Sequence, residues 1–262
     1  MPRARSLIVA ADGDLIVERD AGRPSGRLLR QDDMDASYVD LADARHLEFD
    51  YLRWTRLLVR AFGARRVLHV GGAACTLARA LLAEDRESRH EVIDVDQRVF
   101  DISRAHLGLR RQPGLKLRVA DGRAAIAARA EASADAIVVD AFVGARVPRH
   151  LVTSEALAEF ARVAPVAVVN VVDTPGWPDA RAIAAGIAGA YPHVGALCGR
   201  ARRGSNVVLF GSRSRPDFAR LENLAAADAC PARLLRAPDL AGAGAWRDDQ
   251  ETGGATRAPP GL

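Results

Sequence analysis

Short apolar runs alternate with longer stretches of helical spacing between residues 67 and 190, and this alternation constrains the fold more than any other feature of the chain. Five apolar runs are each followed by a stretch of helical periodicity; the runs lie at residues 67–70, 91–95, 115–119, 136–139 and 166–171, and the stretches at 76–83, 97–106, 122–130, 154–163 and 179–190. Alternating strands and helices predict βαβ units, so we expect an α/β fold with a doubly wound, mostly parallel sheet. Two later runs, at residues 194–197 and 207–210, flank a basic turn at 200–204 and predict a closing antiparallel hairpin.

The chain on either side of this alternation predicts further parts. Residues 1–45 contain four short strand-like runs joined by turns, which predict a small N-terminal β segment. Apolar residues then recur at helical spacing from Leu47 to Phe62, and Gly63 follows where a helix C-cap is expected. Residues 239–262 lack apolar periodicity and are rich in Gly, Ala and Pro, so we expect a disordered tail after a main domain of residues 46–238.

Composition argues against a nucleic-acid partner. With 49% hydrophobic and 27% charged residues, the 262-residue chain is expected to fold around a sizeable core. Its net charge of +4 is accompanied by only 5% aromatic residues. The densest arginine patch, at residues 200–215, lacks the interleaved aromatic side chains of a nucleic-acid site, so we interpret it as a solvated face.

Other absences in the sequence bear on location and metal binding. No apolar run of about 18 residues is present, so we expect no membrane span and a cytoplasmic protein. The three cysteines lack paired spacing and the six histidines lack ligand spacing, which predicts neither disulfides nor a metal site. His69, inside an apolar run, is interpreted as a hydrogen-bonded core residue.

Chemistry is expected at the carboxyl ends of the strands, where doubly wound sheets bind ligands. The first apolar run ends in Gly71-Gly72-Ala73-Ala74-Cys75, whose small residues let a ligand approach the backbone ahead of a helix N-terminus. A tight strand-to-helix turn without a ligand is the alternative. A phosphate loop is not expected, because the lysine that it needs is absent.

Carboxylates end the next three apolar runs. Asp94 stands about 20 residues after the glycine turn, where a carboxylate accepts hydrogen bonds from ribose hydroxyls; Asp96 either shares this role or caps the next helix. Asp121 either accepts from an adenine amino group, with Gly122 leaving room for the ring, or caps a helix. Asp140 ends a central strand, where burial favours an acid/base or amine-orienting role over a purely structural hydrogen bond.

A fifth carboxylate, Asp173, follows the last parallel run. Together with Trp177 it either walls the pocket, as a substrate contact, or caps the next helix.

In their order and spacing, these residues resemble the spermidine synthase-like branch of the class I methyltransferase-fold superfamily. The segments that carry the resemblance are SYVDL (37–41), HLEFDY (46–51), VLHVGGAACTLAR (67–79), EVIDVD (91–96), VADGR (119–123) and VVDAFVGARVP (138–148). The resemblance implies that residues 46–238 form a Rossmann-like nucleoside-binding transferase domain. It also implies a homodimer and a small-molecule amine, or another small acceptor, as substrate.

The resemblance further implies S-adenosylmethionine or its decarboxylated form as co-substrate, without a metal. Gly71 and Gly72 would lie beneath its amino-acid or aminopropyl portion, Asp94 would hold the ribose, and Asp121 with Gly122 the adenine. Asp140 would orient the attacking amine, in a pocket lined by Tyr51 with Glu48 nearby.

Two positions depart from the family pattern. Val143 stands where the family has a second acidic residue, and Arg53 stands where it has a glutamate. Both changes disfavour a doubly charged diamine, so we expect slow or absent transfer to putrescine. Three functions remain open: an aminopropyl or related alkyl transferase acting on an amine, a methyltransferase acting on an unknown acceptor, and a non-catalytic nucleoside-binding homologue. Nicotinamide binding is disfavoured because the third glycine of its motif is missing.

Overall fold

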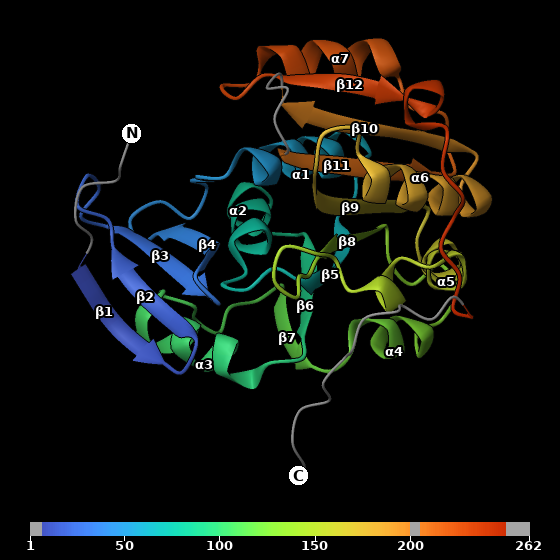
Figure 1. The fold of residues 1–262 in the computed structure, drawn as a ribbon. Coiled ribbons are helices and arrows are strands. Elements are labelled where there is room, and N and C mark those ends of the chain that lie inside the picture. Colours follow the sequence, from blue (N-terminus) through green and yellow to red (C-terminus); the bar gives the residue numbers. More distant parts are fainter. Residues whose placement is uncertain (1–6, 200–204, 250–262) are drawn as a thin grey trace.

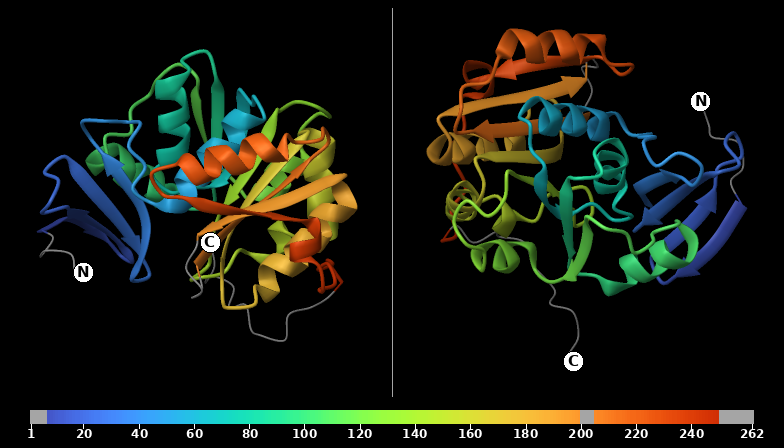
Figure 2. Two further views of the ribbon diagram at one scale, coloured as in Figure 1. Left: turned by 90° about the horizontal axis from the view of Figure 1, so that it is seen from above. Right: turned by 180° about the vertical axis from the view of Figure 1, so that it is seen from behind.

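The computed structural model describes residues 7–199 and 205–249, which form two sheets (Figure 1). The smaller sheet is antiparallel and contains β1 (Leu7–Asp12), β2 (Leu15–Arg19), β3 (Gly26–Gln31) and β4 (Met34–Asp40), in that order. It lies to one side of the main sheet in both views of Figure 2. Each of its strands overlaps one of the four strand-like runs expected near the N-terminus.

The main sheet has eight strands in the order β12-β10-β11-β9-β8-β5-β6-β7. Five of them pair in parallel: β5 (Arg66–Gly71), β6 (Arg89–Asp94), β7 (Leu115–Val119), β8 (Ala136–Asp140) and β9 (Val166–Asp173). The other three, β10 (His193–Gly199), β11 (Ser205–Ser212) and β12 (Ala232–Arg236), extend the β9 edge with antiparallel pairing. The expected α/β fold with a mostly parallel, doubly wound sheet is confirmed.

Helices cover both faces of the main sheet. One apolar core joins the sheet to α4 (Gly122–Ala127), α5 (Ser154–Val163) and α6 (Pro178–Ala190). A second core lies on the other face, against α1 (Asp50–Ala61), α2 (Thr76–Glu84) and α7 (Phe218–Ala227). None of the helices in the described ranges is long and apolar enough to span a membrane.

The small sheet is attached to the main domain through α3 (Gln97–His106). Leu15, Val17 and Leu29 of the small sheet form one buried cluster with Val99 and Ile102 of α3. Because this cluster is apolar and buried, it holds the β3–β4 hairpin close to the carboxyl ends of the parallel strands.

The chain beyond β11 was only partly foreseen. The antiparallel pairing of β10 with β11 is confirmed, but α7 and β12 were not expected. The tip of the hairpin, residues 200–204, lies outside the described residues, as do residues 250–262 of the expected tail.

Residues 241–249, which were expected to be disordered, contact the main domain. Trp246 packs on the first apolar core, and its carbonyl oxygen accepts a hydrogen bond from the amide of Ser154 over 2.8 Å. The Asp248 carboxylate accepts from Arg123 over 2.6 Å and from the Thr153 hydroxyl over 2.7 Å. Here the structure differs from the expectation, because one aromatic residue and one carboxylate supply contacts that composition does not reveal.

Candidate functional site

A cavity of about 1000 Å³ lies between the β3–β4 hairpin and the carboxyl ends of the parallel strands. Its wall includes the turn at residues 31–36, the start of α1, the loops after β5, β6, β7 and β8, and side chains from β9 and β11. Eight of the nine candidate site residues line it: Glu48, Tyr51, Gly71, Gly72, Asp94, Asp121, Gly122 and Asp140. The residues singled out by the strand-end argument and by the family resemblance therefore lie around one cavity, with the exception of Asp173.

The glycine turn after β5 is shaped for close backbone approach. Gly71 has φ of +78°, and a Cβ atom there would lie 2.5 Å from the carbonyl oxygen of Asp140, so only glycine fits. Gly72 has φ of +97° and faces open space, with nothing within 4 Å of the position of a Cβ atom. This turn therefore exposes backbone to the cavity immediately before α2 begins.

Asp94 and Asp96 have different local roles. The Asp94 carboxylate accepts a hydrogen bond from the amide of Asp96 over 3.0 Å, and burial raises the pKa of Asp94 although this hydrogen bond opposes the shift. Asp96 caps α3 by accepting from the amide of Arg98 over 2.8 Å, and it also pairs with the Arg98 guanidinium. The N-cap interpretation of Asp96 is confirmed; both carboxylates line the cavity, and Asp94 is the one that does not cap the helix.

Asp121 is the N-cap of α4. One carboxylate oxygen accepts from the amide of Ala124 over 2.8 Å, and the other lies 2.9 Å from Nε2 of His150. Burial raises the pKa of Asp121, but the amide of Ala124 and the His150 ring outweigh it, and the net shift is downward. His150 also lines the cavity, and the sequence had not suggested it.

Gly122 has a packing role as well as a place in the cavity wall. A Cβ atom at this position would collide with the side chain of Val70 in β5, so the start of α4 approaches the sheet only with glycine there.

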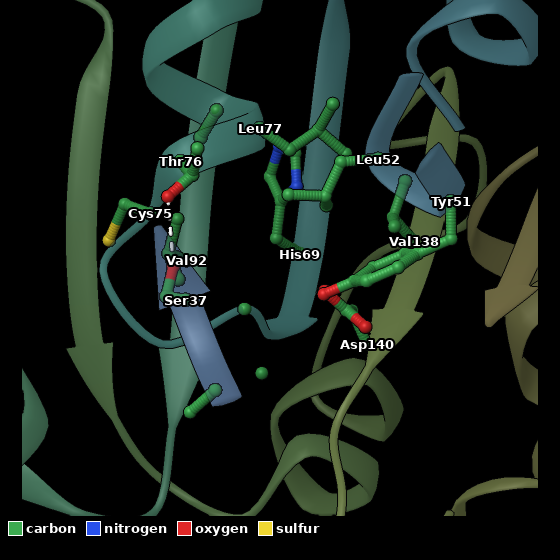
Figure 3. Close-up of a pocket in the computed structure, with 14 residues that line it drawn as sticks. Ser37, Tyr51, Leu52, His69, Cys75, Thr76, Leu77, Val92, Val138 and Asp140 are labelled. Atoms are coloured by element: carbon green, nitrogen blue, oxygen red, sulfur yellow. Dashed lines mark hydrogen bonds between the residues drawn. The ribbon is translucent and has the colours of Figure 1, made fainter. Parts of the chain in front are cut away.

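Asp140 lies at the end of β8 and accepts hydrogen bonds from two directions. Nδ2 of Asn170 in β9 donates to its Oδ1 over 2.9 Å, and the Tyr51 hydroxyl of α1 points at the same carboxylate and donates to it (Figure 3). Burial raises the pKa of Asp140 to about 6, against the opposing effect of these two donors. Burial and the adjacent Asp140 raise the pKa of Tyr51 well above its usual value, so Tyr51 remains a donor.

Asp173 does not line the cavity, and its expected substrate contact is corrected to a capping role. Its carboxylate accepts from the amide of Thr174 over 2.7 Å and from the amide of Ala180, in the first turn of α6, over 2.8 Å. The residue is only 7% exposed. Trp177 packs on the first apolar core and lies under the Arg233 guanidinium. The turn that follows β9 brings the start of α6 close to Asp173, so both carboxylate oxygens accept hydrogen bonds from backbone amides.

The two departures from the family pattern lie in different places. Val143 lines the cavity and is 76% exposed. Arg53 is absent from the cavity wall, and its Nε donates to Asp228 over 2.7 Å. The expected repulsion of a polyamine by Arg53 is therefore wrong. At position 143, however, the cavity wall has a valine and lacks the carboxylate of the family pattern.

His69 is confirmed as a core residue. It is 4% exposed, and its Nε2 lies 3.0 Å from Nδ1 of His90, whose Nε2 lies 2.8 Å from the Ser88 hydroxyl. Burial lowers the pKa of His69 well below its usual value and that of His90 to about 4. Both rings are neutral at pH 7. In the described part of the chain, no group of three or more His, Cys, Asp or Glu residues is arranged to hold a metal ion.

Acidic side chains predominate in the cavity wall, although Arg30 and Arg98, which do not line it, pair with Asp33, Asp35 and Asp96. Among the described residues, no lysine or arginine lines it. Nine carboxylates do: Asp32, Asp33, Asp35, Glu48, Asp50, Asp94, Asp96, Asp121 and Asp140. Because low-dielectric walls concentrate such a field, the cavity favours cationic ligands over anionic ones.

Comparisons with known proteins agree with this architecture. No family model matches the sequence, and no curated protein matches it. The structure is similar to a probable spermidine synthase from Corynebacterium glutamicum ATCC 13032, with 26% sequence identity and a TM-score of 0.81 over 99% of this chain and 100% of that chain.

Two further solved structures share the fold. One is spermidine synthase from Thermotoga maritima, with 16% identity and a TM-score of 0.61 over 81% of this chain and 74% of that one. The other is a spermidine synthase in complex with the transition state analogue AdoDATO, also with 16% identity and a TM-score of 0.61, over 81% of this chain and 75% of that one.

The strand order, the helices on both faces and the cavity at the strand ends define a Rossmann-like fold of the methyltransferase type. Within that class, the likeness over nearly the full length of both chains shows a spermidine synthase-like protein. This likeness supports a transferase of the S-adenosylmethionine type.

Proposed function

We propose that the protein transfers an aminopropyl or related alkyl group from an adenosyl sulfonium to a small amine. The observation that carries this proposal is the charge of the cavity, with nine carboxylates and, in the described residues, no lysine or arginine. Both proposed substrates are cations, and an acidic cavity attracts both. Among the described residues, the cavity wall offers no lysine or arginine to pair with a phosphate group.

The carboxylates and glycines divide the cavity into a donor half and an acceptor half. In the donor half, Asp94 accepts from the two ribose hydroxyls, and Gly71 and Gly72 lie beneath the amino-acid or aminopropyl portion. Asp121 and Gly122 lie beside the adenine. The open space in front of Gly72 and the cavity volume of about 1000 Å³ suit a nucleoside of this size.

Asp140 serves the acceptor half. Its carboxylate orients the amine and takes a proton from it, so that the nitrogen lone pair is free to attack the carbon bound to sulfur. The new carbon–nitrogen bond forms as the carbon–sulfur bond breaks, and the electron pair of that bond neutralises the sulfonium. A pKa of about 6 leaves Asp140 ionised at neutral pH, as an acceptor must be. Tyr51 bonds to Asp140, and Glu48 lines the same cavity.

The missing carboxylate at Val143 favours a second candidate, a methyltransferase. A methyl acceptor needs no second ammonium partner, so the same donor half and Asp140 would serve an acceptor with a single nucleophile. A cytoplasmic location, expected from the lack of a long apolar run, and a homodimer, implied by the family resemblance, both remain predictions.

Thermal stabilisation by a small panel of ligands tests the proposed donor site. Methylthioadenosine and S-adenosylhomocysteine are expected to raise the melting temperature, and NAD is not; a ligand at a hundredfold excess over its Kd contributes about 2.7 kcal/mol. Stabilisation by NAD alone would contradict the proposal.

Release of methylthioadenosine from decarboxylated S-adenosylmethionine, with a set of mono-, di- and triamines, tests the reaction. Release that depends on an amine supports aminopropyl transfer. Formation of S-adenosylhomocysteine from S-adenosylmethionine would support the methyltransferase instead.

A further inference from the structure

A chain of two asparagines leads to Asp140 from the neighbouring strands. Nδ2 of Asn206 in β11 donates to Oδ1 of Asn170 over 3.0 Å, and Nδ2 of Asn170 donates to Oδ1 of Asp140 over 2.9 Å. Asn170 and Asn206 line the same cavity as Asp140. Neither asparagine was among the candidate site residues expected from the sequence.

Asn170 occupies an unusual place for a polar side chain. It lies within the apolar strand VAVVNVVD and is 2% exposed. A buried amide without hydrogen bonds destabilises the fold, so a polar residue in such a strand is tolerated only when both its donor and its acceptor are satisfied. Both are satisfied here, the donor by Asp140 and the acceptor by Asn206.

The direction of the chain follows from the chemistry of its last member. An ionised carboxylate only accepts hydrogen bonds, so the amide of Asn170 must turn its NH₂ group to Asp140. Its oxygen then faces Asn206, which must donate. The strand register makes this contact possible, because Asn170 pairs with Val208 and Asn206 is two residues before Val208 on β11.

We propose that Asn170 is a positioning residue for Asp140, and that Asn206 fixes the orientation of the Asn170 amide. This inference rests on the proposed role of Asp140. Asn170 from β9 and Tyr51 from α1 hold the carboxylate from two sides, so its plane and its charged form are set before an amine binds.

The surroundings of Asp140 make Asn170 the group to test. Tyr51 is the titratable side chain that bonds to Asp140 in the described structure, and it stays protonated. His69, from the adjacent strand β5, is neutral at pH 7. Glu48 and Asp50 line the same cavity from the α1 side. Loss of the Asn170 donor therefore removes one of the two contacts that stabilise the carboxylate.

The experiment follows the titration of Asp140 in the free protein by carbon-detected NMR of labelled aspartate, with its signal assigned from Asp140→Asn. Asn170→Leu, which has a similar volume, is expected to raise the pKa of Asp140 by about one unit, because the donor is lost. Asn206→Leu keeps the Asn170 donor but frees its amide, so a smaller rise is expected. Ser212→Ala, at the far end of β11, is the matched control and should change nothing.

The outcome does not depend on the identity of the substrate. If neither Asn170→Leu nor Asn206→Leu moves the pKa of Asp140, the positioning role is overturned; Asn206→Leu alone decides the matter if Asn170→Leu does not fold. If these variants raise the pKa of Asp140 but the unmodified protein has no transfer activity, the positioning role of Asn170 is supported and the proposed function is refuted. In an active enzyme, Asn170→Leu is expected to lower kcat and move the acidic limb of its pH profile upward, without changing the affinity for methylthioadenosine.

Discussion

The guanidinium of Arg53 donates to the carboxylate of Asp228 over 2.7 Å, although Arg53 follows Tyr51 of the cavity wall by only two residues. Both residues are on α1, where each residue turns the helix by about 100°, so the two side chains leave the helix on opposite sides. The ion pair joins α1 to the end of α7, away from Asp140. Of the two departures that disfavour a diamine, Val143 alone faces the cavity.

Arg53→Glu is accordingly expected to weaken the fold without aiding catalysis. The change places a carboxylate beside Asp228, whose side chain is only 10% exposed, and removes a hydrogen bond between charged groups that is worth about 1.5–3 kcal/mol. Thermal denaturation should show a melting temperature lower by several degrees, with no gain in methylthioadenosine release with putrescine. A variant of unchanged stability and higher activity would place Arg53 in the acceptor site after all.

Val143→Asp is expected to raise the rate with putrescine at least about tenfold, since each 1.36 kcal/mol of transition-state binding is tenfold in rate. An aspartate there supplies a carboxylate for the second ammonium group of the diamine. Val143→Asn, of the same shape but without charge, is the control and should have little effect. Fast turnover by the unmodified protein, at about one per second or more, would instead show that the second carboxylate is dispensable.

Asp94→Ala is expected to abolish the binding of methylthioadenosine in a calorimetric titration. Asp96→Ala is the matched control two residues away, because Asp96 caps α3. Loss of that cap should cost about 1 kcal/mol of stability and leave most of the affinity. If Asp96→Ala lost the ligand and Asp94→Ala kept it, the assignments of the two carboxylates would have to be exchanged.

Much of the fold was predictable because local signals agree with the tertiary structure. The expected bounds of α3, β7 and α5 coincide with those of the structure. Strand-end reasoning also found the part of the cavity wall formed by the loops after β5, β6, β7 and β8, since parallel strands with helical crossovers place their carboxyl ends together.

Other features were not predictable, because they depend on how distant segments meet. Asp140 and Asp173 both end apolar strands. The sequence does not reveal that Asp173 accepts a hydrogen bond from the first turn of the following helix, whereas Asp140 faces the cavity. Asn170 and Asn206 are 36 residues apart, and their contact depends on the register of β9 and β11. The position of Arg53 was within reach of helical periodicity, which separates it from Tyr51.

Asp173→Ala is expected to lower stability and leave ligand binding unchanged. Its carboxylate satisfies two backbone amides, at Thr174 and Ala180, and loss of a helix cap costs about 1 kcal/mol, or about 2–4 °C in a domain of this size. Asp173→Asn, which keeps one acceptor oxygen, should lose less. If Asp173→Ala lost affinity for methylthioadenosine without losing stability, Asp173 would be a ligand contact and not a helix cap.

The titration of Asp140 should contribute to the pH dependence of the free energy of unfolding. Its pKa is about 6 in the folded protein, whereas an unfolded aspartate has a pKa of about 3.9, so the folded state binds the proton more tightly. Protonation of Asp140 therefore stabilises the fold at low pH, and this stabilisation is lost as pH rises from about 4 to about 6. Asp140→Asn removes the titration, so its free energy of unfolding, relative to the unmodified protein, should rise over this interval and stay level above it.

Asp248 is the control for this pH experiment, because its pKa is lowered in the folded protein whereas that of Asp140 is raised. The Arg123 guanidinium and the Thr153 hydroxyl lower the pKa of Asp248 to about 2, so its contribution is present above about pH 4 and is lost as pH falls toward 2. Asp248→Asn should therefore differ from the unmodified protein at neutral pH and converge with it in acid. Urea denaturation of the three proteins between pH 2 and 7 measures both effects. A constant difference between Asp140→Asn and the unmodified protein from pH 4 to 6 would show that burial does not raise the pKa of Asp140.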